Sequence, residues 1–345
     1  MLPAMKRVLI LYTGGTVGMG KAPGQGYRPI PGFLEKLMRS IPMFQAPEVP
    51  AWEIRQYEPL LDSSDVGPRE WTRIAEDIGA AHDDYDGFLV VHGTDTMAYT
   101  ASALGFQLEG LDRPVLVTGS QIPLSETRND AINNLLAALL LIGRFSHRLQ
   151  EVCVFFDNLL LRGNRTTKIH TEGFSAFASP DFPPLGRVGI DFELDERLLR
   201  PRPDPARPLR VVPIDPGVTV GAFRLFPGLR PRFLEALLAP PVQGLVLECF
   251  GAGNAPRDPD LLAALRAATD RGVVVVAVPQ PLHGRADLEL YANGRALLEA
   301  GVVSGRDMTV EAALTKLFYL FSRGLEPAAV RRQVQLDLRG ELSED

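Results

Sequence analysis

The 345-residue sequence contains few of the residues that bind metals or form disulfides, with only two cysteines and five histidines. Cys153 and Cys249 each lie in an apolar segment, which is typical of buried, reduced thiols. The histidines are scattered, and none forms a pair with the spacing of a zinc site. We therefore predict a protein with no metal site and no cofactor.

Excess positive charge and long hydrophobic runs are also missing. The formal net charge is -6, which disfavours nucleic acid or an anionic membrane as the main partner. The apolar run near the start, residues 8–12, is shorter than a signal-peptide core. No run approaches the roughly 20 residues that a membrane span needs. We predict a cytoplasmic protein that binds neither membrane nor nucleic acid.

Several common catalytic motifs are incomplete. Gly15-x-x-x-x-Gly20-Lys21 is close to a P-loop, but Ala22 stands where the motif needs a hydroxyl for magnesium. The dinucleotide fingerprint fails because Gly14 and Gly15 are adjacent. There is no Gly-x-Ser-x-Gly elbow, and neither cysteine lies in a polar turn. An NTPase, a dinucleotide enzyme and the familiar serine or cysteine hydrolases are thus disfavoured.

What the sequence does contain is 46% hydrophobic residues, arranged as short apolar runs that alternate with helical patterns. The runs at 88–92, 114–119 and 152–156 are continuous, which is typical of a parallel sheet covered on both faces. Residues 132–142 are apolar nearly all round, as in a buried helix. We predict an α/β protein of two domains, each built on a mainly parallel sheet flanked by helices.

A segment rich in proline and arginine interrupts this alternation, and we predict that it is an extended linker. The predicted boundaries are 1–199 for a larger N-terminal catalytic domain, 200–216 for the linker and 217–345 for a smaller C-terminal domain. In the last of these, Thr309 is a predicted N-cap for a helix with an apolar stripe.

Hydroxyl, carboxylate and glycine residues follow four predicted strands of the first domain. They are Thr13–Thr16, Asp62–Asp65, Gly93–Thr96 and Thr118–Gln121. Because the carboxyl ends of parallel strands share one edge of a sheet, where ligands bind, we expect these turns to form one site. Thr16 and Thr94 are the candidate nucleophiles. Lys168 is a candidate base, since burial can lower the pKa of a lysine, although an ordinary solvated lysine is the commoner interpretation of such a residue.

The motifs "TGGT", "DSSD", "HGTDT", "RTTK" and "GAGNAP", in this order, resemble those of the bacterial cytoplasmic (type I) L-asparaginases. The resemblance extends over essentially the whole chain. It implies hydrolysis of L-asparagine to L-aspartate and ammonia, through a threonine nucleophile and an acyl-enzyme.

The same resemblance implies roles for individual residues. Thr16 matches the first catalytic threonine, usually assigned as the nucleophile, and Tyr27 matches a tyrosine on a mobile lid. Thr94, Asp95 and Lys168 match the second catalytic group, in which the lysine polarises the threonine hydroxyl. Which threonine attacks at each step stays open.

Substrate-binding roles follow for a further set. Asp95 pairs with the substrate ammonium, Ser63 and backbone N–H groups hold its carboxylate, and Asp62 and Ser64 lie beside them. Asn254 matches an asparagine that reaches the active site from the neighbouring subunit. A homodimer or a dimer of dimers is therefore implied.

The sequence departs from some bacterial relatives at a regulatory asparagine site. An arginine and a cysteine stand there at the positions of Glu248 and Pro281. A carboxylate in place of a cation repels the carboxylate of the effector, so we expect no activation of this form.

Two alternatives to an asparaginase remain. One is a dual glutaminase-asparaginase or an amidotransferase subunit that releases ammonia from glutamine. One methylene separates the two substrates, so apolar contact discriminates only modestly between them. The amidotransferase relatives carry a further domain for tRNA, which we do not expect here. The other alternative is a non-catalytic or phosphate-ligand binding module.

Overall fold

The computed structural model describes residues 5–22 and 26–344. The chain divides into two compact units, each of which is described by itself. The first unit comprises residues 1–179 and 183–211, and the second comprises 180–182 and 212–345. The main division lies within the segment 200–216. In the described part of the chain, no helix combines the length and the apolar character needed to cross a bilayer.

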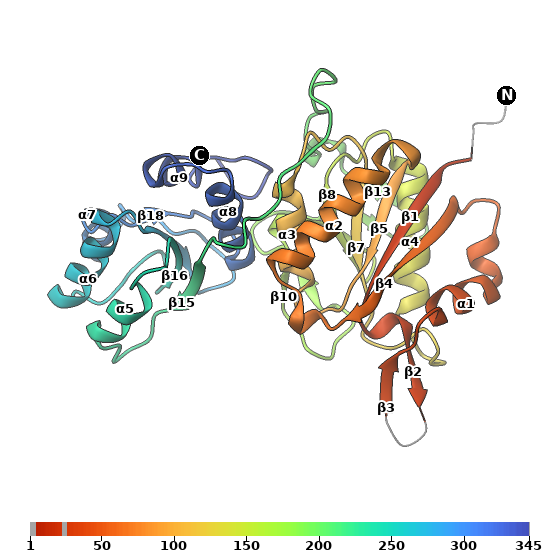
Figure 1. The fold of residues 1–345 in the computed structure, drawn as a ribbon, viewed down its shortest axis with the longest axis horizontal. Coiled ribbons are helices and arrows are strands. Elements are labelled where there is room, and N and C mark those ends of the chain that lie inside the picture. Colours follow the sequence, from red (N-terminus) through yellow and green to blue (C-terminus); the bar gives the residue numbers. More distant parts are fainter. Residues whose placement is uncertain (1–4, 23–25, 345) are drawn as a thin grey trace. The chain divides into compact units, whose positions relative to one another are not determined.

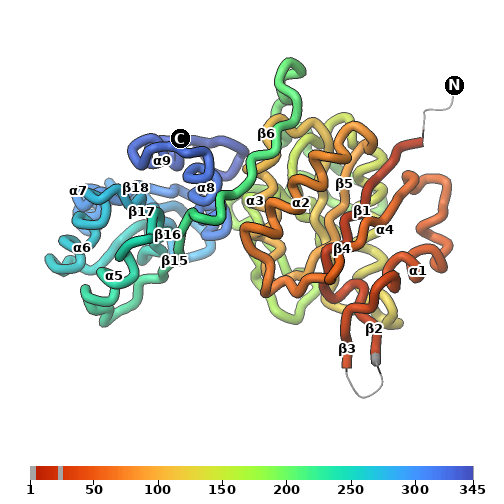
Figure 2. The backbone as a smooth tube through the Cα atoms, viewed as in Figure 1, coloured from red at the N-terminus to blue at the C-terminus, as the bar shows by residue number. Residues whose placement is uncertain are grey.

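The first unit is built on an eight-stranded sheet with the strand order β13-β12-β9-β8-β7-β5-β1-β4. The five strands from β4 to β8 in this order are parallel, and the other three continue the sheet in antiparallel fashion. Figure 2 shows β4, β1 and β5 side by side although helices separate them in sequence. The strands are β1 (Arg7–Gly14), β4 (Ala51–Leu61), β5 (Gly87–Val91), β7 (Val115–Thr118), β8 (Val152–Phe156), β9 (Leu159–Arg162), β12 (Gly186–Val188) and β13 (Phe192–Leu194).

Helices cover both faces of this sheet (Figure 1). Leu9, Leu11 and Val90 point to one face, where they pack with Ile74 of α2 and Leu104 of α3. α4 contacts β1, β5, β7 and β8 from the other face. The main helices are α1 (Phe33–Ser40), α2 (Pro68–Ala81), α3 (Met97–Gln107) and α4 (Ala131–Phe145).

Shorter elements connect these layers. The 3₁₀ helices are η1 (Thr16–Gly18), η2 (Pro42–Gln45), η3 (Ser63–Asp65), η4 (His82–Asp84), η5 (Gly163–Arg165) and η6 (Glu196–Leu198). The short strands form pairs: β2 (Met19–Ala22) with β3 (Gly26–Pro29), β10 (Thr167–Lys168) with β11 (Phe177–Ala178), and β14 (Arg210–Val211) with β6 (Leu108–Glu109). The proline-rich segment therefore contains a paired strand, β14, near its middle.

The second unit is built on four parallel strands: β15 (Val220–Arg224), β16 (Gly244–Cys249), β17 (Val274–Pro279) and β18 (Val303–Ser304). Its helices are α5 (Pro231–Leu237), α6 (Pro259–Asp270), α7 (Ala292–Glu299), α8 (Val310–Ser322) and α9 (Pro327–Gln333). Thr309 caps α8 as predicted, since its Oγ1 accepts from the Ala312 N–H at 3.1 Å. The predicted fold class, two α/β units each with a mainly parallel sheet, is confirmed.

Candidate active site

The turns that follow β1, β4 and β5 are packed against one another through glycine. A Cβ on Gly15 would lie 2.5 Å from the Gly93 nitrogen, and a Cβ on Gly93 would lie 2.5 Å from Ser63 Oγ. Both distances are shorter than any real carbon contact, so only glycine permits this approach. Gly15 also has φ +89, a conformation that L side chains rarely adopt.

The turn after β7 joins the same cluster. A Cβ on Gly119 would lie 2.4 Å from the His92 carbonyl oxygen, and the His92 N–H donates to the Thr118 carbonyl at 2.9 Å. The structure thus brings all four polar turns to one edge of the sheet.

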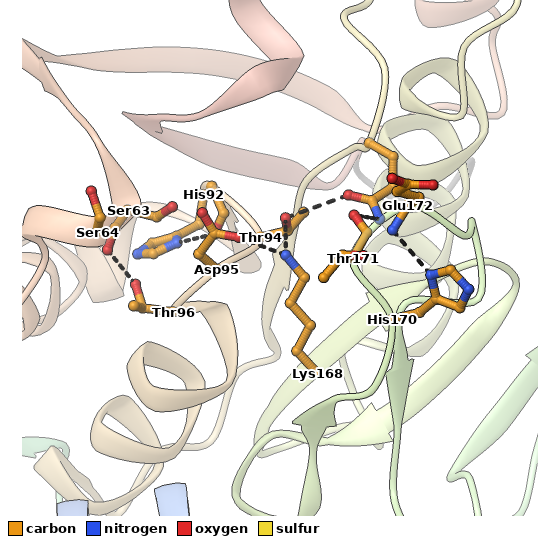
Figure 3. A network of polar contacts seen from close by, with 12 residues as sticks. Ser63, Ser64, His92, Thr94, Asp95, Thr96, Lys168, His170, Thr171 and Glu172 are labelled. Carbon is orange, nitrogen blue, oxygen red and sulfur yellow. Dashed lines mark hydrogen bonds and ion pairs between the residues drawn. The ribbon is translucent and has the colours of Figure 1, made fainter.

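Lys168, Thr94 and Asp95 form the polar centre of this edge (Figure 3). Lys168 Nζ donates to Thr94 Oγ1 at 2.9 Å and to Asp95 Oδ1 at 2.6 Å. Lys168 comes from β10, far along the chain, and its side chain is only 18% exposed. The amino group of Lys168 therefore contacts both the threonine oxygen and the carboxylate from a largely enclosed position.

Thr16 is connected to this centre through the packing of two glycine residues. It follows Gly15, which packs on Gly93, and Gly93 directly precedes Thr94. Thr16 begins η1 and is partly buried. The glycine turn after β1 therefore places Thr16 at the same edge of the eight-stranded sheet as the turn that carries Thr94.

Ser63 and its neighbours line the β4 side of the cluster. Asp62 accepts hydrogen bonds from the Ser64 backbone N–H at 2.9 Å and from Ser64 Oγ at 2.8 Å, and these bonds lower the pKa of Asp62. Thr96 Oγ1 donates to the Ser63 carbonyl at 2.6 Å. Asp62 and Thr96 thus hold the turn, while the Ser63 side chain meets Gly93.

Tyr27 is placed differently from the other predicted catalytic residues. It lies on β3 of a hairpin that projects from the first unit (Figure 1), and it is 43% exposed. Lys21 Nζ lies 5.1 Å from the centre of its ring. Hydrogen bonds from Tyr27 and Lys21 lower the pKa of Glu126. The role of Tyr27 as a lid residue stays a prediction, and the hairpin tip, 23–25, is outside the described residues.

Asn254 belongs to the second unit. It lies in a tight turn after β16, where its backbone exchanges hydrogen bonds with Phe250 at 2.8 and 2.9 Å. Gly251 and Gly253 have positive φ in this turn. The turn fixes Asn254 through its backbone, and its predicted contact with substrate stays a prediction.

Sequence reasoning assigned no role to two residues that hold the cluster, His92 and Gln121, although Gln121 belongs to the predicted turn Thr118–Gln121. His92 is fully buried, and its Nδ1 lies 2.7 Å from the Gly93 carbonyl while its Nε2 lies 3.0 Å from Thr100 Oγ1. Burial lowers the pKa of His92 to about 4, so the imidazole is neutral and Nδ1 carries the proton that meets the carbonyl. Gln121 lies 3.5 Å from Thr94 Oγ1 through its Oε1. The available signal was position, because His92 directly follows the buried strand β5 and Gln121 lies three residues after the end of β7.

Comparisons with known proteins identify the family of this chain. A family model described as "Asparaginase, N-terminal" matches residues 7–200, and one described as "Glutaminase/Asparaginase C-terminal domain" matches residues 219–334. This chain belongs to the asparaginase family. The predicted resemblance to the type I enzymes is confirmed by L-asparaginase 1 of Escherichia coli K12, which is 48% identical over 341 residues covering 99% of each chain.

A solved structure and an amidotransferase component are also similar to this asparaginase-family chain. The crystal structure of L-asparaginase I from Vibrio cholerae matches with a TM-score of 0.91 and 47% identity, covering 99% of this chain and 100% of that one. A glutamyl-tRNA(Gln) amidotransferase component from Aeropyrum pernix is 34% identical, and the match covers 99% of this chain and 81% of that protein. The full-length match to the Vibrio structure extends the likeness over both units.

Proposed function

We propose that this protein is an L-asparaginase, which hydrolyses the side-chain amide of L-asparagine to L-aspartate and ammonia. The observation that carries the proposal is the hydrogen bond of 2.9 Å from Lys168 Nζ to Thr94 Oγ1, next to the glycine turn that presents Thr16. Family membership and the full-length likeness to L-asparaginase 1 support it.

In the proposed mechanism Thr16 attacks the amide carbon and forms an acyl-enzyme. A threonine hydroxyl is inert until its proton is removed. As Thr94 takes a proton from the attacking Thr16 hydroxyl or from water, its own proton passes to Lys168 in the neutral amine form, whose Nζ lies 2.9 Å from Thr94 Oγ1. Lys168 returns this proton through Thr94 to the amide nitrogen, which leaves as ammonia. Water then hydrolyses the ester to release aspartate, and its proton passes by the same groups to restore the Thr16 hydroxyl.

The proposed recognition of substrate uses opposite charges at its two ends. Asp95 pairs with the substrate ammonium, and Ser63 with nearby backbone N–H groups holds the carboxylate. Backbone N–H groups of the glycine turns at 15 and 93 are suited to the oxyanion, because such donors are fixed before the reaction begins.

Release of ammonia from glutamine is the second candidate. The likeness to an amidotransferase component supports it, and one methylene is a modest barrier. We expect asparagine to be preferred, with weak activity on glutamine.

We also expect a homodimer or a dimer of dimers in the cytoplasm, with Asn254 reaching the neighbouring subunit's site. Light scattering measures the subunit number.

The test is ammonia release from L-asparagine by the wild type and by Thr16→Ala, Thr94→Val and Lys168→Met. Residues that act as a unit give large, non-additive losses. We expect each variant to lose about 10²- to 10⁴-fold in kcat, the range for an acid–base group, and a double variant to lose little more. Near-normal turnover by any single variant removes that residue from the mechanism. No turnover by the wild type refutes the proposal.

A further inference from the structure

A short loop follows the lysine of the candidate active site. Lys168 is the last residue of β10 and pairs with Phe177 of β11, so residues 169–176 form the closed end of this hairpin. The Ile169 N–H donates to the Ala176 carbonyl at 2.8 Å, which closes the base of the loop. The position of the loop is therefore tied to the position of Lys168.

His170 organises the backbone of this loop (Figure 3). Its Nδ1 accepts from the Glu172 N–H at 3.0 Å and from the Gly173 N–H at 2.7 Å. A nitrogen that accepts from two N–H groups carries no proton of its own. Gly173 lies flat against the ring, since a Cβ there would be 3.1 Å from two ring carbons. The imidazole thus fixes the turn 171–173.

The turn 171–173, once fixed, orients the side chain of Gln121. Gln121 Nε2 donates to the Thr171 carbonyl at 3.1 Å and to the Gly173 carbonyl at 3.0 Å. The main chain of Gln121 is held separately, because its N–H donates to Asp130 Oδ2 at 2.9 Å. With the amide nitrogen engaged by two carbonyls, the amide oxygen is left facing the active site.

That oxygen faces Thr94. The Thr94 oxygen already accepts from Lys168 at 2.9 Å, so its own proton must point elsewhere. Gln121 Oε1 lies 3.5 Å away and accepts it, at the long end of hydrogen-bond range. The direction of the Thr94 hydroxyl proton therefore depends on Gln121, which is oriented by the turn 171–173, which in turn is fixed by His170.

We propose that His170 is a positioning residue for catalysis, which acts through the turn 171–173 and Gln121 to set the direction of the Thr94 hydroxyl proton. This inference rests on the proposed function. His170 touches neither Thr94 nor Lys168 in these contacts, and it works by accepting two backbone hydrogen bonds. Any side chain that supplies the same acceptor should replace it.

The experiment compares His170→Ala with His170→Asn in steady-state hydrolysis of L-asparagine. Asparagine accepts from backbone N–H groups two and three residues on through its side-chain oxygen, so it keeps the turn. We expect His170→Ala to lower kcat about tenfold, the equivalent of one hydrogen bond, with KM changed less than about twofold. His170→Asn should restore kcat to within about twofold of the wild type.

The matched control is His147→Ala, which removes another exposed histidine of the first unit beyond the end of α4. It should leave kcat and KM unchanged. Wild-type kcat in His170→Ala, an Asn variant as slow as the Ala variant, or an effect on KM alone overturns the inference.

A second readout does not depend on activity. Hydrogen exchange of the Glu172 and Gly173 amides should be faster in His170→Ala than in the wild type, and slow again in His170→Asn. Equal exchange in all three proteins also overturns the inference. A wild type that releases no ammonia defeats the proposed function instead, and the exchange data then still test the role of His170 in the loop.

Discussion

A buried ion pair in the second unit offers the sharpest test of what stabilises this fold. Lys316 of α8 pairs with Glu341 near the C-terminal end, and both side chains are 0% exposed. Lys316 Nζ also donates to the Leu336 carbonyl at 2.5 Å. Glu341 accepts from the Leu338 N–H at 3.0 Å and from the Arg339 N–H at 2.6 Å. The ion pair and its hydrogen bonds therefore hold residues 336–341 against α8.

Lys316→Met removes the cation and leaves the carboxylate enclosed. Breaking a buried pair in this way costs about 3–5 kcal/mol, because an uncompensated charge stays in a low-dielectric site. That is a large share of the roughly 5–15 kcal/mol by which domains are stable. Lys6→Met is the control, since Lys6 pairs with Asp86 at 2.8 Å but its side chain is 45% exposed. We expect about 1 kcal/mol or less from that exposed pair.

The assay is urea unfolding, followed by far-UV circular dichroism and by tryptophan fluorescence. Far-UV circular dichroism reports the helices of both units, whereas both tryptophans, Trp52 and Trp71, lie in the first unit. We expect Lys316→Met to lower the free energy of unfolding seen by circular dichroism by about 3–5 kcal/mol at pH 7. A loss of about 1 kcal/mol or less, equal to that of Lys6→Met, refutes the reasoning.

The loss should also depend on pH. Burial alone raises the pKa of Glu341, but the Lys316 charge and the hydrogen bonds to the carboxylate outweigh it and lower the pKa. A lowered carboxyl pKa stabilises the folded state above the unfolded pKa of about 4.3, and this contribution disappears as the pH falls through the folded pKa. In Lys316→Met the lysine charge is gone and burial raises the pKa of Glu341, so this carboxyl takes up a proton at higher pH in the variant than in the wild type. The stability difference between the two proteins should therefore shrink as the pH falls from the raised pKa of the variant to the lowered pKa of the wild type.

Two further predictions concern the active site and its regulation. Gly15→Ala should reduce asparagine hydrolysis at least about a hundredfold, because a misplacement of about 1 Å costs that much and the new Cβ would lie 2.5 Å from the Gly93 nitrogen. Gly324→Ala, in the turn after α8, is the matched control, because a Cβ there meets nothing within 4 Å and its φ of +67 is also positive; equal activity of the two variants in the ammonia assay would contradict the packing argument. The rate should rise hyperbolically with asparagine concentration, because the resemblance predicts that Glu248, which pairs with Arg224 at 3.4 Å, stands where relatives have a cation for the effector carboxylate. A sigmoidal curve that is lost on substitution of Glu248 would show this prediction to be wrong.

The parallel core of each unit was predictable because its strands are buried on both faces. Every residue of β5, β7 and β8 is buried, so these strands appear in the sequence as continuous apolar runs. The antiparallel extension by β12 and β13 was not predictable. Both strands have three residues, and Arg187 and Glu193 at their centres are exposed. The seven-residue helix α9 carries too short an apolar pattern for prediction.

The residues of the candidate site could be predicted from the sequence, but the hydrogen bonds that orient them could not. Strand ends and the resemblance together pointed to Thr16, Thr94 and Lys168. The supporting contacts around them, such as those of His170 and the amide nitrogen of Gln121, use backbone carbonyls and N–H groups. Every residue type offers these groups, so such contacts leave no trace in the sequence. Gln121 illustrates this, because its two amide hydrogen bonds go to the backbone of a loop about 50 residues away.

The two kinds of contact have different consequences for the chemistry. The glycine contacts between 15, 93 and Ser63 fix where the turns lie, since each leaves no room for a carbon atom. They do not fix where the Thr94 hydroxyl proton points, because a hydroxyl rotates freely about its C–O bond. Lys168 constrains that rotation from one side by occupying the oxygen, and Gln121 constrains it from the other by accepting the proton. Substitutions of glycine should thus damage the whole site at once, whereas substitutions at His170 should lower kcat in an otherwise intact site.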